Sequence, residues 1–221
     1  MTHASSNARS GPGRGIFVVL DGIDGCGKTT QADLLVRALQ QNTGREVLHL
    51  REPGSTRLGE SLRALLLAPG REVSPAVEVL LFAAARRQML DEIVAPALAR
   101  GAHVVVERFH PSTVAYQGAA GGLGEAAVIE LLERFAGSPR PDRVILLELT
   151  PEAAQERCVR AERRRDRIEA KGIEFQRRVA EGFRRYAASA RDADELVRVV
   201  DAERPVEVVA SDVLAEVTRV L

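Results

Sequence analysis

The chain is poor in cysteine and has no excess of either charge. Its 221 residues include two cysteines, Cys26 and Cys158, and its 31 Lys and Arg residues offset 31 Asp and Glu residues. Two isolated cysteines form neither a disulfide framework nor a metal-binding spacing, which fits a reducing, cytoplasmic location. The balanced charge gives no reason to expect a nucleic-acid polymer or a membrane surface as partner, and no apolar run is long enough to span a bilayer.

The N-terminal stretch lacks the apolar segment of a signal peptide. Residues 1–14 are small and polar and include several Gly and Ser residues, so we expect a disordered tail and not a targeting sequence. The hydrophobic content of 45% is ordinary for a globular protein. No internal repeat or linker divides residues 15–221, which we expect to form one domain.

The most specific motif in the chain is rich in glycine. Residues 22–29 read G-x-x-x-x-G-K-T, between an apolar β-branched run at 16–20 and a helical pattern that begins at Lys28. In this setting the motif predicts a phosphate-binding loop, because glycines let backbone N–H groups point inward and the helix N-terminus attracts phosphate. Lys28 is expected to reach the β- and γ-phosphates, and the Thr29 hydroxyl to bind Mg²⁺. The residues predicted to hold ATP are Gly22, Ile23, Asp24, Gly25, Cys26, Gly27, Lys28, Thr29 and Thr30.

Strand-like apolar runs alternate with amphipathic helical patterns along the whole chain. This order predicts an α/β fold of the P-loop NTPase type, with three α/β/α layers and a mostly parallel five-stranded sheet. The expected strands cover residues 16–21, 46–50, 102–106, 144–149 and 197–200. The expected helices cover residues 28–42, 58–67, 75–100, 112–118, 125–135 and 152–171, then a stretch up to about 191, and finally 205–221.

Charged residues follow two of the predicted strands, at the sheet edge where ligands bind in open parallel α/β proteins. Arg51 begins the segment Arg-Glu-Pro-Gly, and its planar guanidinium suits a phosphate. Taken alone, it is better explained as a surface arginine beside a turn. Glu107 and Arg108 end another strand, where the carboxylate could organise Mg²⁺ and the arginine could hold a second anion. An exposed ion pair explains these two residues as readily.

Two residue pairs further along the chain suggest recognition of a nucleotide. Phe82 and Arg86 share one face of the long predicted helix, so Phe82 could stack on a base while Arg86 donates to its edge. Core packing is the better explanation of Phe82 alone, whereas an arginine within an apolar helical face needs a partner. Tyr116 and Gln117 could read a sugar or base by hydrogen bonding. The alternative is a half-buried tyrosine on a capped helix.

The densest charge feature is a run of six arginines. They are Arg157, Arg160, Arg163, Arg164, Arg165 and Arg167. Acidic residues interleave with them, which weakens an RNA-binding interpretation, and a solvated helical face is the usual explanation of such a run. Beside a phosphate loop, the run can instead supply positive charge to a transferring phosphoryl group. We therefore predict a helical lid at about residues 157–171.

These motifs, in this order, resemble bacterial thymidylate kinase, a P-loop nucleoside monophosphate kinase. The resemblance covers nearly the whole chain after the tail. The Arg-Glu-Pro-Gly segment at 51–54 and the Ala-Tyr-Gln-Gly segment at 115–118 are far more specific than the phosphate loop alone. The other segments that carry it are residues 62–67, 78–82, 85–86, 107–108, 112–114, 140–142, 149–152 and 166–169. The resemblance implies Mg²⁺-dependent phosphoryl transfer from ATP to dTMP, giving dTDP, by a homodimer packed through helices.

The resemblance also implies how dTMP would be held. Asp24 would accept a hydrogen bond from its 3′-hydroxyl, and Arg51 and Arg108 would hold its phosphate. Phe82 would stack on thymine while Arg86 donates to thymine O4. The remaining substrate-binding residues would be Tyr116, at the position where a 2′-hydroxyl would clash, and Gln117.

The same resemblance implies which residues act in catalysis. No arginine stands in the phosphate loop, so the catalytic arginine would come from the lid, with Arg160 as first choice and Arg157 and Arg163 as alternatives. The expected catalytic residues are Lys28, Arg51, Glu107, Arg108 and Arg160, and the expected metal-site residues are Thr29 and Glu107.

The chain departs from the family pattern at residues 107–111. They read Glu-Arg-Phe-His-Pro, where the family usually begins this segment with Asp-Arg-Tyr or Asp-Arg-His, and the longer Glu107 could shift the metal geometry by about one methylene. Two other functions stay open from the sequence. A kinase for another nucleoside or nucleotide would keep the loop and lid without the Phe82 and Arg86 pair. A regulatory guanine-type switch would show an Asn-Lys-x-Asp segment, which the sequence lacks.

Overall fold

The computed structural model describes residues 13–161, 166–191 and 196–221. Most of the predicted tail therefore lies outside the described residues. Arg14, which the prediction included in the tail, forms an ion pair with Asp142, with 3.0 Å between Arg14 Nη1 and Asp142 Oδ1. No helix within the described ranges has the length and apolar character needed to cross a membrane.

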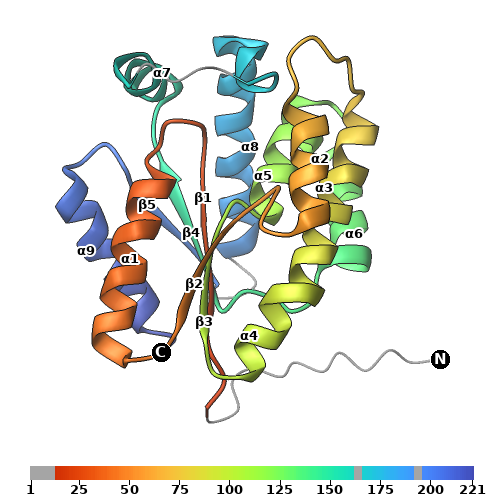
Figure 1. Ribbon diagram of the computed structural model, residues 1–221. Helices are drawn as coiled ribbons and strands as arrows, with labels where there is room; N and C mark the ends of the chain where they lie inside the picture. Colours follow the sequence, from red (N-terminus) through yellow and green to blue (C-terminus); the bar gives the residue numbers. More distant parts are fainter. Residues whose placement is uncertain (1–12, 162–165, 192–195) are drawn as a thin grey trace.

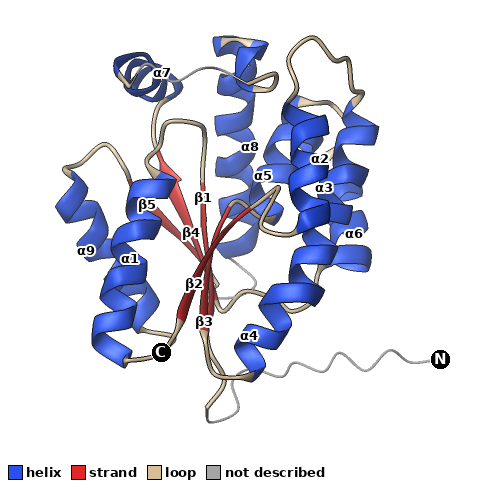
Figure 2. Cartoon of the chain, in the orientation of Figure 1, coloured by secondary structure: helices blue, strands red, loops and turns tan. Residues whose placement is uncertain are grey.

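A five-stranded parallel sheet forms the centre of the fold (Figure 2). Its strand order is β2-β3-β1-β4-β5. The strands are β1 (Phe17–Asp21), β2 (Val47–Arg51), β3 (His103–Glu107), β4 (Arg143–Glu148) and β5 (Val197–Asp201). β1 is buried along its whole length, as expected of a central strand that helices cover on both faces. Every pairing between neighbouring strands is parallel. The predicted α/β class with five parallel strands is confirmed.

Helices cover both faces of this sheet (Figure 1). α1 and α9 contact each other and cover one face, while α4 and α8 contact strands from the other. The elements are α1 (Lys28–Thr43), α2 (Arg57–Leu67), α3 (Pro75–Met89), the π-helix η1 (Leu90–Val94), α4 (Ala95–Ala99), α5 (His110–Thr113), the π-helix η2 (Val114–Ala120), α6 (Glu125–Ala136), α7 (Pro151–Arg160), the 3₁₀ turn η3 (Glu169–Lys171), α8 (Ile173–Arg191) and α9 (Val206–Thr218).

Local capping explains where several helices begin. The side chain of Thr150 accepts a hydrogen bond from the backbone N–H of Ala153, and Pro151 occupies the first turn of α7. At the start of α3, the side chain of Ser74 accepts a hydrogen bond from the backbone N–H of Val77, and Pro75 occupies the first turn. Both arrangements satisfy a backbone donor that has no partner inside the helix. The prediction of Thr150 as a cap is confirmed.

Three helix predictions differ from the structure. The helix predicted at 75–100 contains the π-helical turn η1 between α3 and α4, and the segment predicted at 112–118 begins at His110 and continues as η2. The helix predicted at 152–171 ends at Arg160, and the next described element after it is the short turn η3. A continuous helix would have set arginines three and four residues apart on one face, where like charges repel.

A small apolar cluster packs α3, which carries Phe82, against η2, which carries Tyr116. Val79 and Ala83 of α3 pack with Val114 of η2, and with Val128 and Leu132 of α6. This packing holds α3 against η2, so the helices that bear Phe82 and Tyr116 keep a fixed relation to each other.

Candidate active site

The phosphate-binding loop joins β1 to α1 and curls around the side chain of Lys28. This lysine is buried, and its Nζ donates to the backbone oxygens of Gly22 at 3.0 Å and Ile23 at 2.8 Å. Gly25 has a φ of 83°, and a Cβ there would lie 2.5 Å from the backbone oxygen of Ala154. Only glycine is therefore tolerated where the loop passes α7. Together these contacts hold the lysine inside the loop that the motif predicted.

A large cleft lies beside this loop at the carboxyl edge of the sheet. Its volume is about 970 Å³, within the range of ligand-binding clefts. Loop residues 24–30 line it together with Arg51, Glu107 and Arg108, so the structure brings the predicted strand-end charges to the phosphate loop. The Arg51 side chain is 57% exposed and lies 3.5 Å from Glu60, which leaves it able to turn toward an anion in the cleft.

The two predicted metal-site residues meet at the mouth of the loop. Thr29 Oγ1 donates to Glu107 Oε2 at 2.7 Å. A hydroxyl beside a carboxylate suits Mg²⁺, which takes oxygen ligands and commonly keeps several waters next to one or two carboxylates. Among the described residues, no group of three or more His, Cys, Asp or Glu side chains gathers to hold a metal. The residues present therefore fit a nucleotide-bound Mg²⁺ better than an all-protein metal site.

The second oxygen of Glu107 contacts a histidine that the sequence did not single out. His49 Nε2 lies 2.9 Å from Glu107 Oε1, and His49 Nδ1 lies 3.2 Å from Asp33 Oδ1 of α1. The hydrogen bond with Glu107 is the main cause of a raised pKa at His49. Burial alone would raise the pKa of Glu107, but the hydrogen bonds from His49 and Thr29 outweigh burial, and its pKa is lowered. The carboxylate is thus held in its charged form.

A partly buried polar cluster lies where the cleft meets a second pocket. Arg108 contacts Asp24 Oδ1 through Nη2, and its Nη1 donates to Ser112 Oγ at 3.0 Å. Tyr116 donates through its hydroxyl to Asp24 Oδ2 at 2.7 Å. Burial, reinforced by the Asp24 charge, raises the pKa of Tyr116 well above its usual range, so the phenol stays a donor. Asp24 and Arg108 line both spaces.

Arg86 has the partner that its apolar surroundings require. Its Nε donates to Glu52 Oε2 at 2.8 Å, and its Nη2 lies 2.6 Å from Oε1 of the same carboxylate. Nη2 also donates to Thr113 Oγ1 at 2.8 Å, and the guanidinium stacks 4.7 Å from the centre of the Phe109 ring. Nη1 is buried and has no hydrogen-bond partner among the described residues. Because Arg86 lines the second pocket, Nη1 is available to an acceptor on a ligand.

The second pocket also contains the other residues predicted to recognise a base. Phe82, Tyr116 and Gln117 line it with Arg86. Phe82 also belongs to the main apolar core, so the core-packing explanation is confirmed. Its place in the pocket leaves stacking on a base a prediction. Phe109, one of the departures from the family pattern, contributes the ring on which Arg86 stacks.

A buried glutamate joins this pocket to the last arginine of the run and to Lys171 beyond it. Glu78 is 1% exposed and accepts a hydrogen bond from Gln117 Nε2 at 2.8 Å. Arg167 Nη2 lies 2.7 Å from Glu78 Oε1, and Lys171 Nζ lies 3.5 Å from the same oxygen. The C-terminal part of the predicted lid, 157–171, is therefore tied to α3 beside the pocket.

The candidate lid arginines differ in their positions. Arg157 is half-buried, lines the cleft and donates through Nη2 to the backbone oxygen of Ala202 at 2.9 Å. Arg160 is exposed and is not among the residues that line the cleft. Arg163 lies outside the described residues. In this structure Arg157 is the arginine of α7 that contacts the cleft.

Two further parts of the site were missed from the sequence. Residues 202–206, after β5, form one wall of the cleft, and Gln31 Nε2 donates to the backbone oxygen of Val206 at 3.0 Å. Residues 202–206 could have been predicted as part of the site, because they follow a parallel strand.

Arg63 of α2 lines both the cleft and the second pocket. Burial, followed by repulsion from Arg51, lowers the pKa of Arg63.

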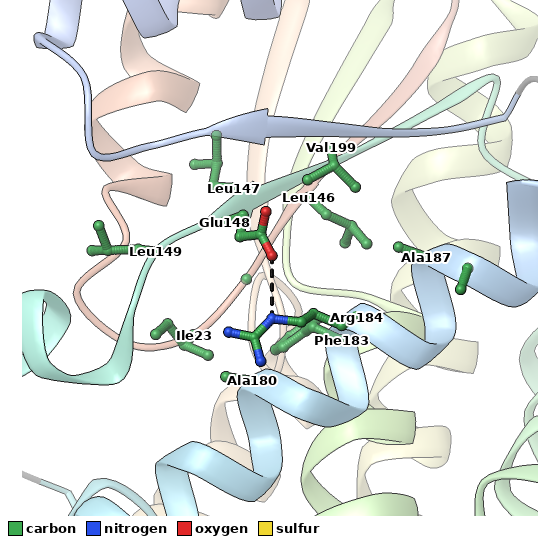
Figure 3. Close-up of a pocket in the computed structure, with 12 residues that line it drawn as sticks. Ile23, Leu146, Leu147, Glu148, Leu149, Ala180, Phe183, Arg184, Ala187 and Val199 are labelled. Carbon is green, nitrogen blue, oxygen red and sulfur yellow. Dashed lines mark hydrogen bonds and ion pairs between the residues drawn. The ribbon is translucent and has the colours of Figure 1, made fainter.

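A separate cavity of about 260 Å³ lies between α8 and the ends of β4 and β5 (Figure 3). Glu148 and Arg184 form an ion pair across it at 3.3 Å, and its other labelled side chains are apolar. Of the predicted site residues, it contains Gly22 and Ile23. With none of the predicted catalytic side chains in it, this cavity lacks the groups for phosphoryl transfer.

Comparison with known proteins shows which family the chain belongs to. Residues 20–213 match the family model described as thymidylate kinase. The chain is 42% identical over 213 residues to the thymidylate kinase of Pelotomaculum thermopropionicum, covering 94% of this chain and 95% of the relative. It is 43% identical over 208 residues to that of Desulforudis audaxviator, covering 94% and 92%. A match to that of Caldanaerobacter subterraneus subsp. tengcongensis is 42% identical over 172 residues, covering 78% and 81%. The chain therefore belongs to the thymidylate kinase family.

Proposed function

We propose that this chain transfers the γ-phosphoryl group of ATP to dTMP, giving dTDP. The observation that carries the proposal is the junction of two binding spaces. The phosphate-loop cleft and the pocket around Phe82 and Arg86 share Asp24 and Arg108. Nucleotides bound in these two spaces would bring their phosphates together at the junction, as a transfer between them requires.

On the donor side, Lys28 would leave the carbonyl oxygens of Gly22 and Ile23 for the β- and γ-phosphates of ATP. The backbone N–H groups of the loop would hold the same phosphates at the N-terminus of α1. Thr29 and Glu107 would hold Mg²⁺, which supplies positive charge to the β- and γ-phosphate oxygens when bound. The loop between β5 and α9 would border the adenosine end of the nucleotide.

On the acceptor side, the free Nη1 of Arg86 supports donation to thymine O4, with Phe82 stacked on the ring. Asp24 would accept from the 3′-hydroxyl, and Arg51 and Arg108 would hold the phosphate that attacks. Tyr116 and Gln117 would complete the sugar and base contacts. Glu52 holds the guanidinium of Arg86 from the opposite side, so the donor is positioned before substrate arrives.

A lid arginine would compensate charge on the transferring phosphoryl group. Arg160 was the first choice from the sequence, but the contact of Arg157 with the cleft supports Arg157 at least as well. The tie of Arg167 and Lys171 to Glu78 supports a lid anchored at its C-terminal end.

The two cysteines form no disulfide in the described structure, which supports a reducing, cytoplasmic location.

A homodimer would use the outer surface of α2, α3 and α6. These three helices lie next to one another on one side of the molecule (Figure 1). They carry the exposed apolar side chains Leu58, Leu65, Val77, Leu80 and Phe135. Exposed apolar side chains that gather on neighbouring elements mark interaction surfaces, which supports a dimer packed through these helices.

The Lys28→Ala variant should lose phosphoryl transfer while it keeps its fold. The lysine contacts charge that grows in the transition state, so kcat should fall by roughly two to three orders of magnitude. Initial rates and melting temperatures would be measured beside Arg37→Ala, an exposed position on α1. Near-normal turnover in folded Lys28→Ala would refute the role of the loop.

Removing the guanidinium of Arg86 should weaken dTMP binding and leave ATP binding nearly unchanged. Arg86→Ala alone would strand the buried Glu52 charge, and Glu52→Gln alone would strand the buried Arg86 charge. Both residues are therefore replaced in Glu52→Gln/Arg86→Met, which is compared with the wild type. The unpaired thymine oxygen should cost about 1–3 kcal/mol, or about 5- to 150-fold in KM for dTMP. If the KM for ATP changes instead, α3 faces the other nucleotide.

One lid arginine should be essential for turnover. Arg157→Ala, Arg160→Ala and Arg163→Ala would be compared with Arg177→Ala, which removes an exposed ion pair with Glu152 on α7. Loss of the catalytic arginine should lower kcat by about a thousandfold. Hydrogen exchange in residues 157–171 should slow with a bisubstrate analogue but not with dTMP alone. If all three variants keep a normal kcat and nucleotide does not change the hydrogen-exchange rate, the arginine run is a solvated helical face.

The Leu80→Asp variant should dissociate the dimer. A charge at this position, 56% exposed on α3, would lose its water in an apolar interface. Sedimentation velocity would compare it with Val208→Asp on α9, which is 42% exposed and lies on the other side of the sheet. A mass unchanged by Leu80→Asp, or changed equally by both variants, would rule out this surface as the interface.

A further inference from the structure

His49 is the least expected side chain in contact with Glu107, the predicted metal-site carboxylate. It lies on β2, and Glu107 ends the neighbouring strand β3. In the parallel register, His49 pairs with Val105 and Arg51 pairs with Glu107. His49 and Glu107 are therefore diagonal neighbours on one face of the sheet, a spacing that long side chains can bridge.

Each oxygen of Glu107 has a different partner. Oε1 lies 2.9 Å from His49 Nε2, while Oε2 accepts from Thr29 Oγ1 at 2.7 Å. The ring of His49 is fixed in turn by Asp33 of α1, with 3.2 Å between Nδ1 and Oδ1. The Glu107 side chain is 13% exposed and that of His49 is 26% exposed, so neither group is loosely held in solvent.

We propose that His49 is a positioning residue for phosphoryl transfer: it holds Oε1 of Glu107 so that Oε2 stays beside Thr29 for Mg²⁺. The inference rests on the proposed role of Glu107 at the metal site. It explains why a glutamate serves at this position. An aspartate is one methylene shorter and would not reach His49 across the diagonal while its other oxygen stays beside Thr29.

The test measures metal binding as well as activity. Mn²⁺ binding to the complex with the non-hydrolysable ATP analogue AMPPNP would be followed by electron paramagnetic resonance, and kcat and KM would be measured for dTMP. His49→Leu should weaken Mn²⁺ binding about tenfold or more and lower kcat comparably, as loss of a ligand's supporting partner does. The KM for dTMP should change less than twofold.

Three comparisons distinguish a positioning role of His49 from a general loosening of β2. Leu48→Ala alters the adjacent residue, whose side chain points to the opposite face of the sheet, and should leave Mn²⁺ binding unchanged. In the Glu107→Asp background, His49→Leu should change Mn²⁺ binding less than twofold further, since the contact is already lost. His49→Gln, which retains one N–H donor, should recover part of the loss.

Wild-type Mn²⁺ binding by His49→Leu would overturn the inference. Equal losses from His49→Leu in the wild-type and Glu107→Asp backgrounds would do the same, because His49 would then act independently of the carboxylate. If His49→Leu does not fold, His49→Val, which also suits a strand, takes its place under the same criteria. A wild-type chain that does not phosphorylate dTMP would instead refute the proposed function, so the two failures are distinguishable.

Discussion

Parallel pairing of β1, β2 and β3 is the constraint on which the rest of the site depends. Glu107 aligns with Leu20 of β1 on one side and with Arg51 of β2 on the other. The three strands therefore end at one level, and the phosphate loop, Glu107 and Arg51 leave the sheet together. Antiparallel pairing of any of these strands would send one of these groups to the opposite edge.

Buried and partly buried carboxylates orient the donors on the proposed acceptor side. Glu52 holds Arg86, Glu78 holds Gln117 and Arg167, and Asp24 holds Arg108 and Tyr116. Buried ion pairs add little net stability, because desolvation offsets much of their attraction. Their value here is geometric. Each carboxylate sets the direction of a donor before the substrate arrives, so less reorganisation is needed during transfer.

The sequence predicted the elements and the loop because both depend on local patterns. Alternating apolar runs indicated all five strands, and the glycine spacing identified the turn around Lys28. The sequence also indicated that Arg86 needs a partner, but not which one, since Glu52 lies 34 residues away. The contacts of His49 with Glu107 and of Glu78 with Arg167 join elements that are far apart in the sequence. The periodicity of a helix or strand therefore cannot predict them. The early end of α7 at Arg160 was missed because the basic pattern continues at helical spacing beyond the point where like charges oppose a helix.

The central claim is that two nucleotides meet at Asp24 and Arg108, and that the acceptor is dTMP. The most direct measurement is ADP release from ATP and Mg²⁺ in a coupled assay, with dTMP, dUMP, dCMP, dAMP and dGMP supplied in turn. A buried donor aimed at a base carbonyl should make kcat/KM for dTMP exceed that for the cytosine and purine monophosphates by about two orders of magnitude. ADP release that is as fast without any monophosphate, or fastest with one of those others, would contradict the account.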